Sequence, residues 1–73
     1  MPKLPQISED DAIKVFEKLG WQLSRQQGSH MIMTKSGSIY TLSIPKKIVL
    51  ALGLLRDLIK KADILVDDFS RLL

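Results

Sequence analysis

His30 is the single histidine of the chain, and its place directly after Gly28 and Ser29 makes it the first residue to consider for chemistry. The ordinary pKa of an imidazole lies near neutrality, so a histidine can both accept and release a proton under physiological conditions. Ser29 is interpreted as a turn hydroxyl, because no aspartate is placed to complete a nucleophilic triad with it. Gly28 is interpreted as a backbone requirement, either for a positive φ or for close approach to a phosphate.

Basic residues gather in the middle of the chain. The formal net charge is +3, and residues 21–61 contain seven Lys or Arg side chains against one acid, Asp57. Such a charge distribution favours binding of a polyanion such as nucleic acid, or of an acidic protein partner. It is also typical of a lysine-rich surface that is only hydrated and binds no partner. The candidate nucleic-acid-binding residues are Arg25, Gly28, Ser29, Lys35, Lys46 and Lys47. Contacts from the cations among them would set affinity without reading sequence.

The composition excludes several kinds of site. The chain has no cysteine, which removes thiol nucleophiles, disulfides and thiolate zinc sites, and one histidine cannot build a multi-histidine metal cage. Acidic residues concentrate at 9–11 and 67–68, where helix starts explain them, so we expect neither a metal nor a cofactor. No apolar run approaches the roughly 18 residues of a membrane span, and no signal-peptide core follows Met1; we expect no membrane contact and a cytoplasmic location.

The length and composition predict one small globular domain. The 73 residues are 45% hydrophobic and 26% charged, which is enough apolar material for one core and too little chain for two. We expect a single domain over 1–73, with residues 1–7 as a flexible lead-in. Ser8 is a good N-cap for a helix over 8–19 that ends at Gly20, since its first turn is acidic and its apolar residues recur at helical spacing.

The period of the sequence changes after Gly20. Alternation predicts strands over 21–26, 30–34 and 39–44, joined by a turn at Gly28-Ser29 and a hairpin at 35–38, with Pro45 closing the last strand. A second helix is predicted over 47–62, or from Gly53 if 46–52 is a loop, and a short helical turn follows from Asp67. Two helices can cover one face of a three-stranded sheet. The predicted fold class is therefore α+β, a two-layer double-stranded-RNA-binding-domain-like fold with α-β-β-β-α order.

At this point several short motifs, taken in order, resemble one known family. They are Gly20-Trp21, Arg25-Gln26, Gly28-Ser29-His30, Ile44-Pro45 and Gly53-Leu54-Leu55-Arg56, followed by Ile59, Ala62 and Ile64. No single piece is specific, but the joint order at this length resembles the HicA (YcfA-like) toxin family. The resemblance covers the chain from about Ile13 to Phe69.

The resemblance implies a toxin of a type II toxin–antitoxin pair that acts as an mRNA endoribonuclease and takes part in a stress response. It implies RNA as substrate, a HicB-like antitoxin as protein partner, and His30 as the catalytic residue. A metal-independent cleavage can use the 2′-hydroxyl of the RNA as nucleophile, with His30 in one proton-transfer role. Water, Tyr40 or a lysine would then fill the other role.

Two alternatives stay open at this stage. Lys47 stands where the family commonly has a second histidine, and the apolar segment 48–55 replaces lysines. These features suit a non-catalytic module that binds RNA or protein on the same fold, or a homo-oligomer formed through 48–55. A DNA-binding partner of a regulator is a weaker alternative, because no helix-turn-helix spacing appears. The alternation of the 30–34 strand does not decide which of its faces carries His30, because that face has mixed polarity.

Overall fold

The computed structural model describes residues 4–47 and 49–73. Within these residues the elements, in chain order, are α1 (Glu9–Lys18), β1 (Gln22–Gln27), β2 (His30–Thr34), β3 (Leu42–Pro45), α2 (Leu52–Lys61) and α3 (Val66–Arg71). The three strands form an antiparallel sheet in the order β1-β2-β3. The α+β class and the element order agree with the prediction from the sequence.

Helix α1 begins and ends where its sequence predicts. The Ser8 side-chain oxygen accepts a hydrogen bond from the Asp11 backbone N–H at 3.3 Å. Acidic residues fill the first turn, where their negative charge interacts favourably with the positive end of the helix dipole. At the other end Gly20 has φ +98°, a left-handed conformation that glycine adopts without steric cost. The helix therefore stops in time for the chain to turn into β1.

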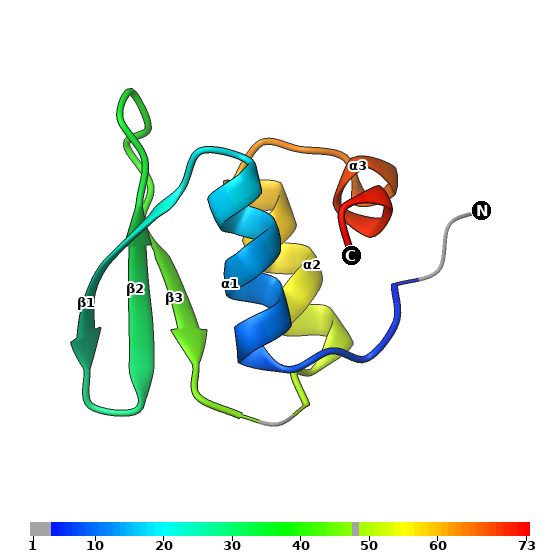
Figure 1. The fold of residues 1–73 in the computed structure, drawn as a ribbon, viewed down its shortest axis with the longest axis horizontal. Coiled ribbons are helices and arrows are strands. Elements are labelled where there is room, and N and C mark those ends of the chain that lie inside the picture. The colour runs from blue at the N-terminus through cyan, green and yellow to red at the C-terminus, as the bar shows by residue number, and fades with distance from the viewer. Residues whose placement is uncertain (1–3, 48) are drawn as a thin grey trace.

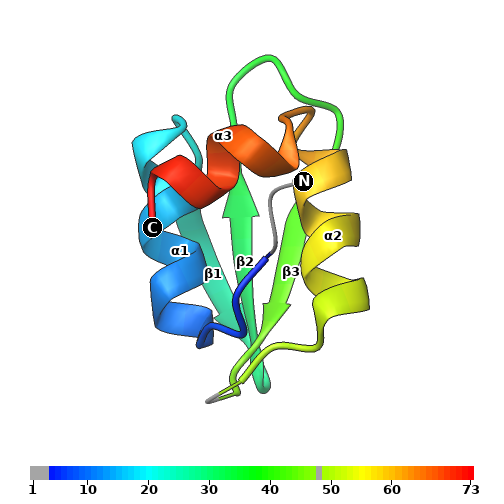
Figure 2. The same ribbon diagram turned by 90° about the vertical axis from the view of Figure 1, so that its right-hand side faces the viewer.

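Helices cover one face of the sheet, and among residues 4–47 and 49–73 no element covers the other, here called the bare face (Figure 1). Figure 1 shows α1 and α2 side by side against the same face, and Figure 2 shows α3 crossing both helices on the side away from the sheet. The core lies between these layers, where Phe16 of α1 and Phe69 of α3 are fully buried with ring centroids 5.2 Å apart. From the sheet, Met33, Leu42 and Ile44 contribute fully buried side chains. The covered face thus takes the apolar half of each strand pattern.

The third strand is shorter than predicted. Strand β3 covers Leu42–Pro45, whereas the sequence predicts a strand over 39–44, and Ile39 and Tyr40 are 90% and 53% exposed. The reason lies in the register: Leu42 pairs with Met33, so Ile39 and Tyr40 have no strand residues left to pair with once β2 has ended at Thr34. The Ser38 hydroxyl instead accepts a hydrogen bond from the Tyr40 N–H at 3.2 Å, which holds this segment in a turn.

The second helix begins at Leu52, close to the later of the two starts that the sequence allows. Helix α2 covers Leu52–Lys61 with Ala51 as N-cap, and a helix from residue 47 is wrong. The preceding loop is held by backbone hydrogen bonds, from the Leu50 N–H to the Ile7 carbonyl at 2.8 Å and from the Glu9 N–H to the Lys47 carbonyl at 3.1 Å. These bonds are incompatible with a helix that starts earlier.

The apolar segment 48–55 divides between the core and the surface. Leu50 and Leu55 are fully buried, while Val49 and Leu52 are exposed; Ile48 lies outside the described residues. Burial of Leu50 and Leu55 accounts for part of the unusual apolar content of this stretch. Self-association through 48–55 stays a prediction.

The N-terminal segment is not a free lead-in over the part that the structure describes. Leu4 and Ile7 are buried in the core cluster, and the Ile7 carbonyl accepts the hydrogen bond from Leu50. The prediction of a flexible lead-in over 1–7 is therefore wrong for residues 4–7, because two apolar side chains there find a place in the core. Residues 1–3 lie outside the described residues.

Candidate functional site

Alternation along β2 places His30 on the bare face of the sheet. Met33 is fully buried and Met31 packs against the core, so both point toward the helices. Since successive side chains of a strand point to opposite faces, His30, Ile32 and Thr34 occupy the other face. His30 is exposed. The question that the sequence left open, which face carries His30, is thereby answered: the face that no helix covers in Figure 1.

The register of the sheet brings specific neighbours to His30. Gln27 pairs with His30 across β1 and β2, and Ser43 pairs with Ile32 across β2 and β3. These four side chains line a shallow hollow of about 250 Å³ on the bare face. Among the residues that line the hollow, His30 alone carries an imidazole, the kind of side chain that most often transfers protons in enzymes. The hollow therefore offers one proton-transfer group, with an amide and a hydroxyl that can hydrogen-bond to a substrate.

Arg25 reaches the same face through an irregularity in β1. The register shifts between Leu23 and Arg25, so the pairing of Leu23 with Met33 is followed by that of Arg25 with Ile32. The extra residue, Ser24, lets Leu23 point toward the covered face and Arg25 toward the bare one. Arg25 is exposed, on the strand next to His30 and opposite a residue of the hollow. A cation thus lies on the bare face, on the strand next to β2 and two residues along from Gln27, the partner of His30.

The β1–β2 hairpin closes the sheet at the His30 end. Gly28 has φ +60°, and an added Cβ would meet no atom within 4 Å, so its glycine is required by conformation rather than by crowding. The Gln26 side-chain amide donates to the Gly28 carbonyl at 3.1 Å, and the Lys46 N–H donates to the Ser29 carbonyl at 2.7 Å. The second bond ties the end of β3 to this hairpin.

Lys46 and Lys47 lie at the same end of the molecule as His30 but turn toward helix α1. Lys46 follows Pro45, which pairs with His30, and both lysines line a groove with Ser8, Glu9 and Asp10. Burial raises the pKa of the Glu9 carboxyl, Asp10 raises it further, and Lys46 opposes the increase. The two cations therefore border the site from the helix side, next to carboxylates that partly offset their charge.

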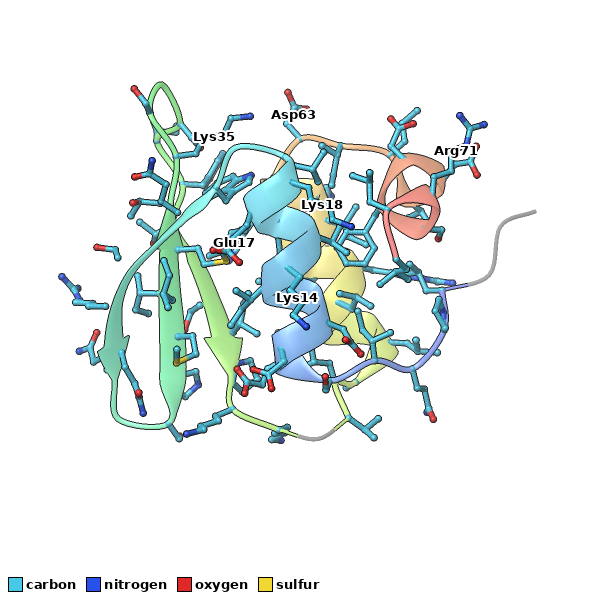
Figure 3. All side chains as sticks on the ribbon, viewed as in Figure 1. Lys14, Glu17, Lys18, Lys35, Asp63 and Arg71 are labelled. Atoms are coloured by element: carbon cyan, nitrogen blue, oxygen red, sulfur yellow. The ribbon has the colours of Figure 1, made fainter. Side chains whose placement is uncertain are left out.

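Lys35 and Tyr40 lie at the opposite end of the sheet. His30 opens β2 and Lys35 follows its last residue, so about five residues of extended chain, roughly 16 Å, separate them. Lys35 lies over Gly20, where a Cβ would meet the Lys35 Cε at 3.4 Å, and Figure 3 labels it near that end of the molecule. Of the six predicted binding residues, the structure groups Arg25, Gly28, Ser29, Lys46 and Lys47 at or beside the His30 end, and Lys35 stands apart.

In the comparison with protein families, residues 10–64 match the model described as HicA toxin of bacterial toxin-antitoxin. The chain belongs to the HicA toxin family. The match contains α1 except its first residue, the whole sheet with His30, and α2, and it ends before α3. The order helix, three-stranded antiparallel sheet, helices is consistent with the double-stranded-RNA-binding-domain-like fold of HicA. No curated protein matches the chain.

Five of the eight carboxylates of this HicA chain lie at helix starts. Glu9, Asp10 and Asp11 fill the first turn of α1, and Asp67 and Asp68 fill that of α3. Across residues 4–47 and 49–73, no three side chains of His, Asp or Glu gather as metal ligands. In the same ranges, no helix has the length and hydropathy needed to cross a bilayer.

Gln27 and Ser43 are the site residues that the sequence analysis did not single out. A two-residue turn at Gly28-Ser29 makes Gln27 the partner of His30, so the predicted turn is enough to predict this pairing. Ser43 could have been predicted in a similar way, because it is the polar residue between Leu42 and Ile44 in an alternating strand. The bulge that brings Arg25 to this face has no comparable signal in the sequence.

Proposed function

We propose that this HicA toxin is a metal-independent endoribonuclease that cleaves mRNA with His30 as its proton-transfer residue. The single observation that carries the proposal is the position of His30, exposed on the bare face of the sheet in a hollow with Gln27, Ile32 and Ser43. A histidine with a purely structural role would gain nothing from this position. A histidine that serves a polymeric substrate needs open access of this kind.

The proposed chemistry uses the RNA itself as the source of the nucleophile. The 2′-hydroxyl oxygen attacks the adjacent phosphorus, the bond from phosphorus to the 5′-oxygen breaks, and a 2′,3′-cyclic phosphate and a 5′-hydroxyl form. One group removes the 2′-hydroxyl proton and another protonates the leaving oxygen. His30 takes one of these roles. Gln27 and Ser43 can donate hydrogen bonds to the substrate or accept them beside the imidazole.

We assign the second proton-transfer role to water. Tyr40 is too distant, because it precedes Pro45, the residue that pairs with His30, by five residues along the chain. Lys46 is adjacent to Pro45 in the chain, but it lines the groove with Glu9 and Asp10 on the α1 side and not the hollow. General acid–base assistance contributes about 10²–10⁴-fold per group, so a site with one well-placed group predicts a modest enzyme.

The proposed RNA contacts surround the hollow on two sides. Arg25 contributes a cation on the bare face, and Lys46 and Lys47 contribute cations at the hairpin end. Gly28 and Ser29 form the hairpin tip, where the missing side chain of Gly28 leaves open space for a phosphate to approach the backbone. Lys35 is in the set predicted from the sequence, but it lines a different groove, with Lys60 and Lys61, so we leave it out of the proposed RNA path.

The remaining parts of the proposal concern where and with whom the toxin acts. Because the proposed substrate is mRNA, we propose that the toxin acts in the cytoplasm. Membership of a toxin–antitoxin family implies a partner that silences the toxin, and we propose a HicB-like antitoxin in this role. A basic surface is most simply blocked by a protein of opposite charge.

The test compares two substitutions on the same face of the sheet. His30→Ala is expected to abolish growth arrest and mRNA cleavage while the fold is kept, as judged by circular dichroism. Gln22→Ala is the matched control, because Gln22 is exposed and pairs with Thr34 at the far end of that face. A His30→Ala variant that stays toxic would overturn the assignment. A 2′-deoxy nucleotide at the cleavage position should block cleavage by the parent chain, and unchanged cleavage would overturn the proposed nucleophile.

A non-catalytic binding module is the second candidate, and one observation favours it. Gln27, Ile32 and Ser43, the residues that line the hollow with His30, supply an amide, an alkyl group and a hydroxyl but no second acid or base for proton transfer. This candidate would be supported if RNA binds with a steep salt dependence but is not cleaved, even at high protein concentration.

A further inference from the structure

A second basic groove lies at the end of the molecule away from His30. The turn between β2 and β3 faces the C-terminal end of α2, and between them is a groove of about 410 Å³, here called the hairpin–helix groove. It is lined by Trp21, by residues 35–40 and by residues 60–63. The proposed nuclease site uses none of these residues.

The charge of the hairpin–helix groove is positive. Lys35, Lys60 and Lys61 line it against one carboxylate, Asp63, and Figure 3 shows Lys35 and Asp63 at this end of the molecule. The lysines of α2 also complement the negative end of that helix dipole. Lys35 belongs to the turn after β2, where its side chain lies over Gly20 at the end of α1, and it faces the same groove from a second element. Convergence of lysines from two elements indicates an anionic ligand.

The groove also has apolar character. Ile39 and Tyr40 are exposed beside the lysines, although both are large apolar side chains. Trp21 is 2% exposed, and its buried indole N–H has no acceptor among the described residues. Trp21 therefore contributes ring surface, and not an accessible hydrogen-bond donor, to the lining of the groove.

We propose that the hairpin–helix groove binds an acidic segment of a protein partner, with carboxylates on the lysines and an apolar side chain on Ile39 and Tyr40. An RNA strand is the less suitable occupant for two reasons. The groove lies at the far end of β2 from His30 and on the side of the sheet that the helices cover, so one strand would have to leave the bare face to reach it. Its exposed apolar surface also suits a peptide side chain better than a phosphate backbone.

The single tryptophan makes the test direct, because a ¹⁵N-labelled chain gives one indole signal. The probe is a short peptide of glutamates with interspersed leucines, and the control peptide has glutamine in place of every glutamate. The titrations use the His30→Ala chain, so that the outcome is independent of the proposed nuclease activity. We expect the acidic peptide to shift the Trp21 indole signal and the amide signals of Lys35 and Lys61, while those of Gln27 and Ser43 stay in place.

Charge reversal at one lysine gives the matched comparison. Lys61→Glu is expected to weaken peptide binding about three- to tenfold, since it removes one surface ion pair and introduces a like charge. Lys14→Glu changes the net charge equally on α1, outside the groove, and should leave binding within about twofold. Equal weakening by both substitutions would overturn a specific site. So would an unmoved indole signal, or a 2′-O-methyl RNA that shifts the groove signals when the acidic peptide does not.

Discussion

Replacement of Arg25 by alanine tests whether RNA crosses the bare face of the sheet. Arg25 is exposed, pairs with Ile32 of the hollow, and has no carboxylate partner among the described residues. Its guanidinium is therefore free to meet a phosphate next to the bond that His30 would act on. The bulge at Ser24 is what turns it to this face, so the prediction depends on the observed register.

The magnitude follows from counterion release. Each phosphate of a single strand that a cation neutralises adds about 0.7 to the slope of log K against log salt concentration. With a 1 M salt reference, one lost contact weakens binding about fourfold at roughly 0.15 M salt and about eightfold at roughly 0.05 M. Arg25→Ala should therefore flatten the slope by about 0.7, with the larger loss of affinity at low salt.

Fluorescence anisotropy with a labelled 2′-O-methyl RNA measures this effect without cleavage. Lys14→Ala is the matched control, because it removes the same charge from an exposed position on α1. Lys35→Ala is the second comparison, since its cation lies at the far end of β2. An unchanged slope for Arg25→Ala together with a flatter slope for either lysine variant would refute a path over the bare face.

Three further predictions concern the scaffold that holds the site. Phe69→Ala should cost about 3–5 kcal/mol, most of the stability of so small a domain, because its buried ring packs on Phe16; a urea midpoint from Trp21 fluorescence that barely moves would contradict this. Ser8→Ala should cost about 1 kcal/mol by removing the cap of α1, and no loss in the same assay would show that the cap contributes nothing. Burial raises the pKa of Glu9, so the folded state holds this proton more tightly than the unfolded state, and the stability it contributes is lost as pH rises above the ordinary carboxyl range. Glu9→Gln should gain stability relative to the parent chain between about pH 4 and pH 7, and a difference that is constant with pH would exclude this effect.

The sequence predicts those parts of the fold that depend on local signals. Helix α1 was bounded by its cap and by Gly20, and β2 was bounded by turns on both sides. Ile39 and Tyr40 fit a strand pattern, but strand pairing is a long-range property, and β2 ends before it can pair with them. In the same way, the burial of Leu4 could not be predicted, because the core residues that cover it come from distant parts of the chain.

The candidate site was predictable in type but not in geometry. The resemblance pointed to His30, and charge pointed to the cations, without any information on how they are arranged. Pairing across the sheet brings Arg25 near His30, whereas the length of β2 separates Lys35 from it. The distinction between these two cations rests on one bulge and on strand length, and neither has a reliable signal in a single sequence.

Single-turnover cleavage by the parent chain and by His30→Ala, measured beside RNA affinity, tests the central claim most directly. The imidazole on the bare face is proposed to transfer a proton and not to hold the RNA. We therefore expect the rate to fall by about 10²–10⁴-fold while the affinity stays within about twofold. A rate within about tenfold of the parent, or a loss that lies wholly in affinity, would contradict the account.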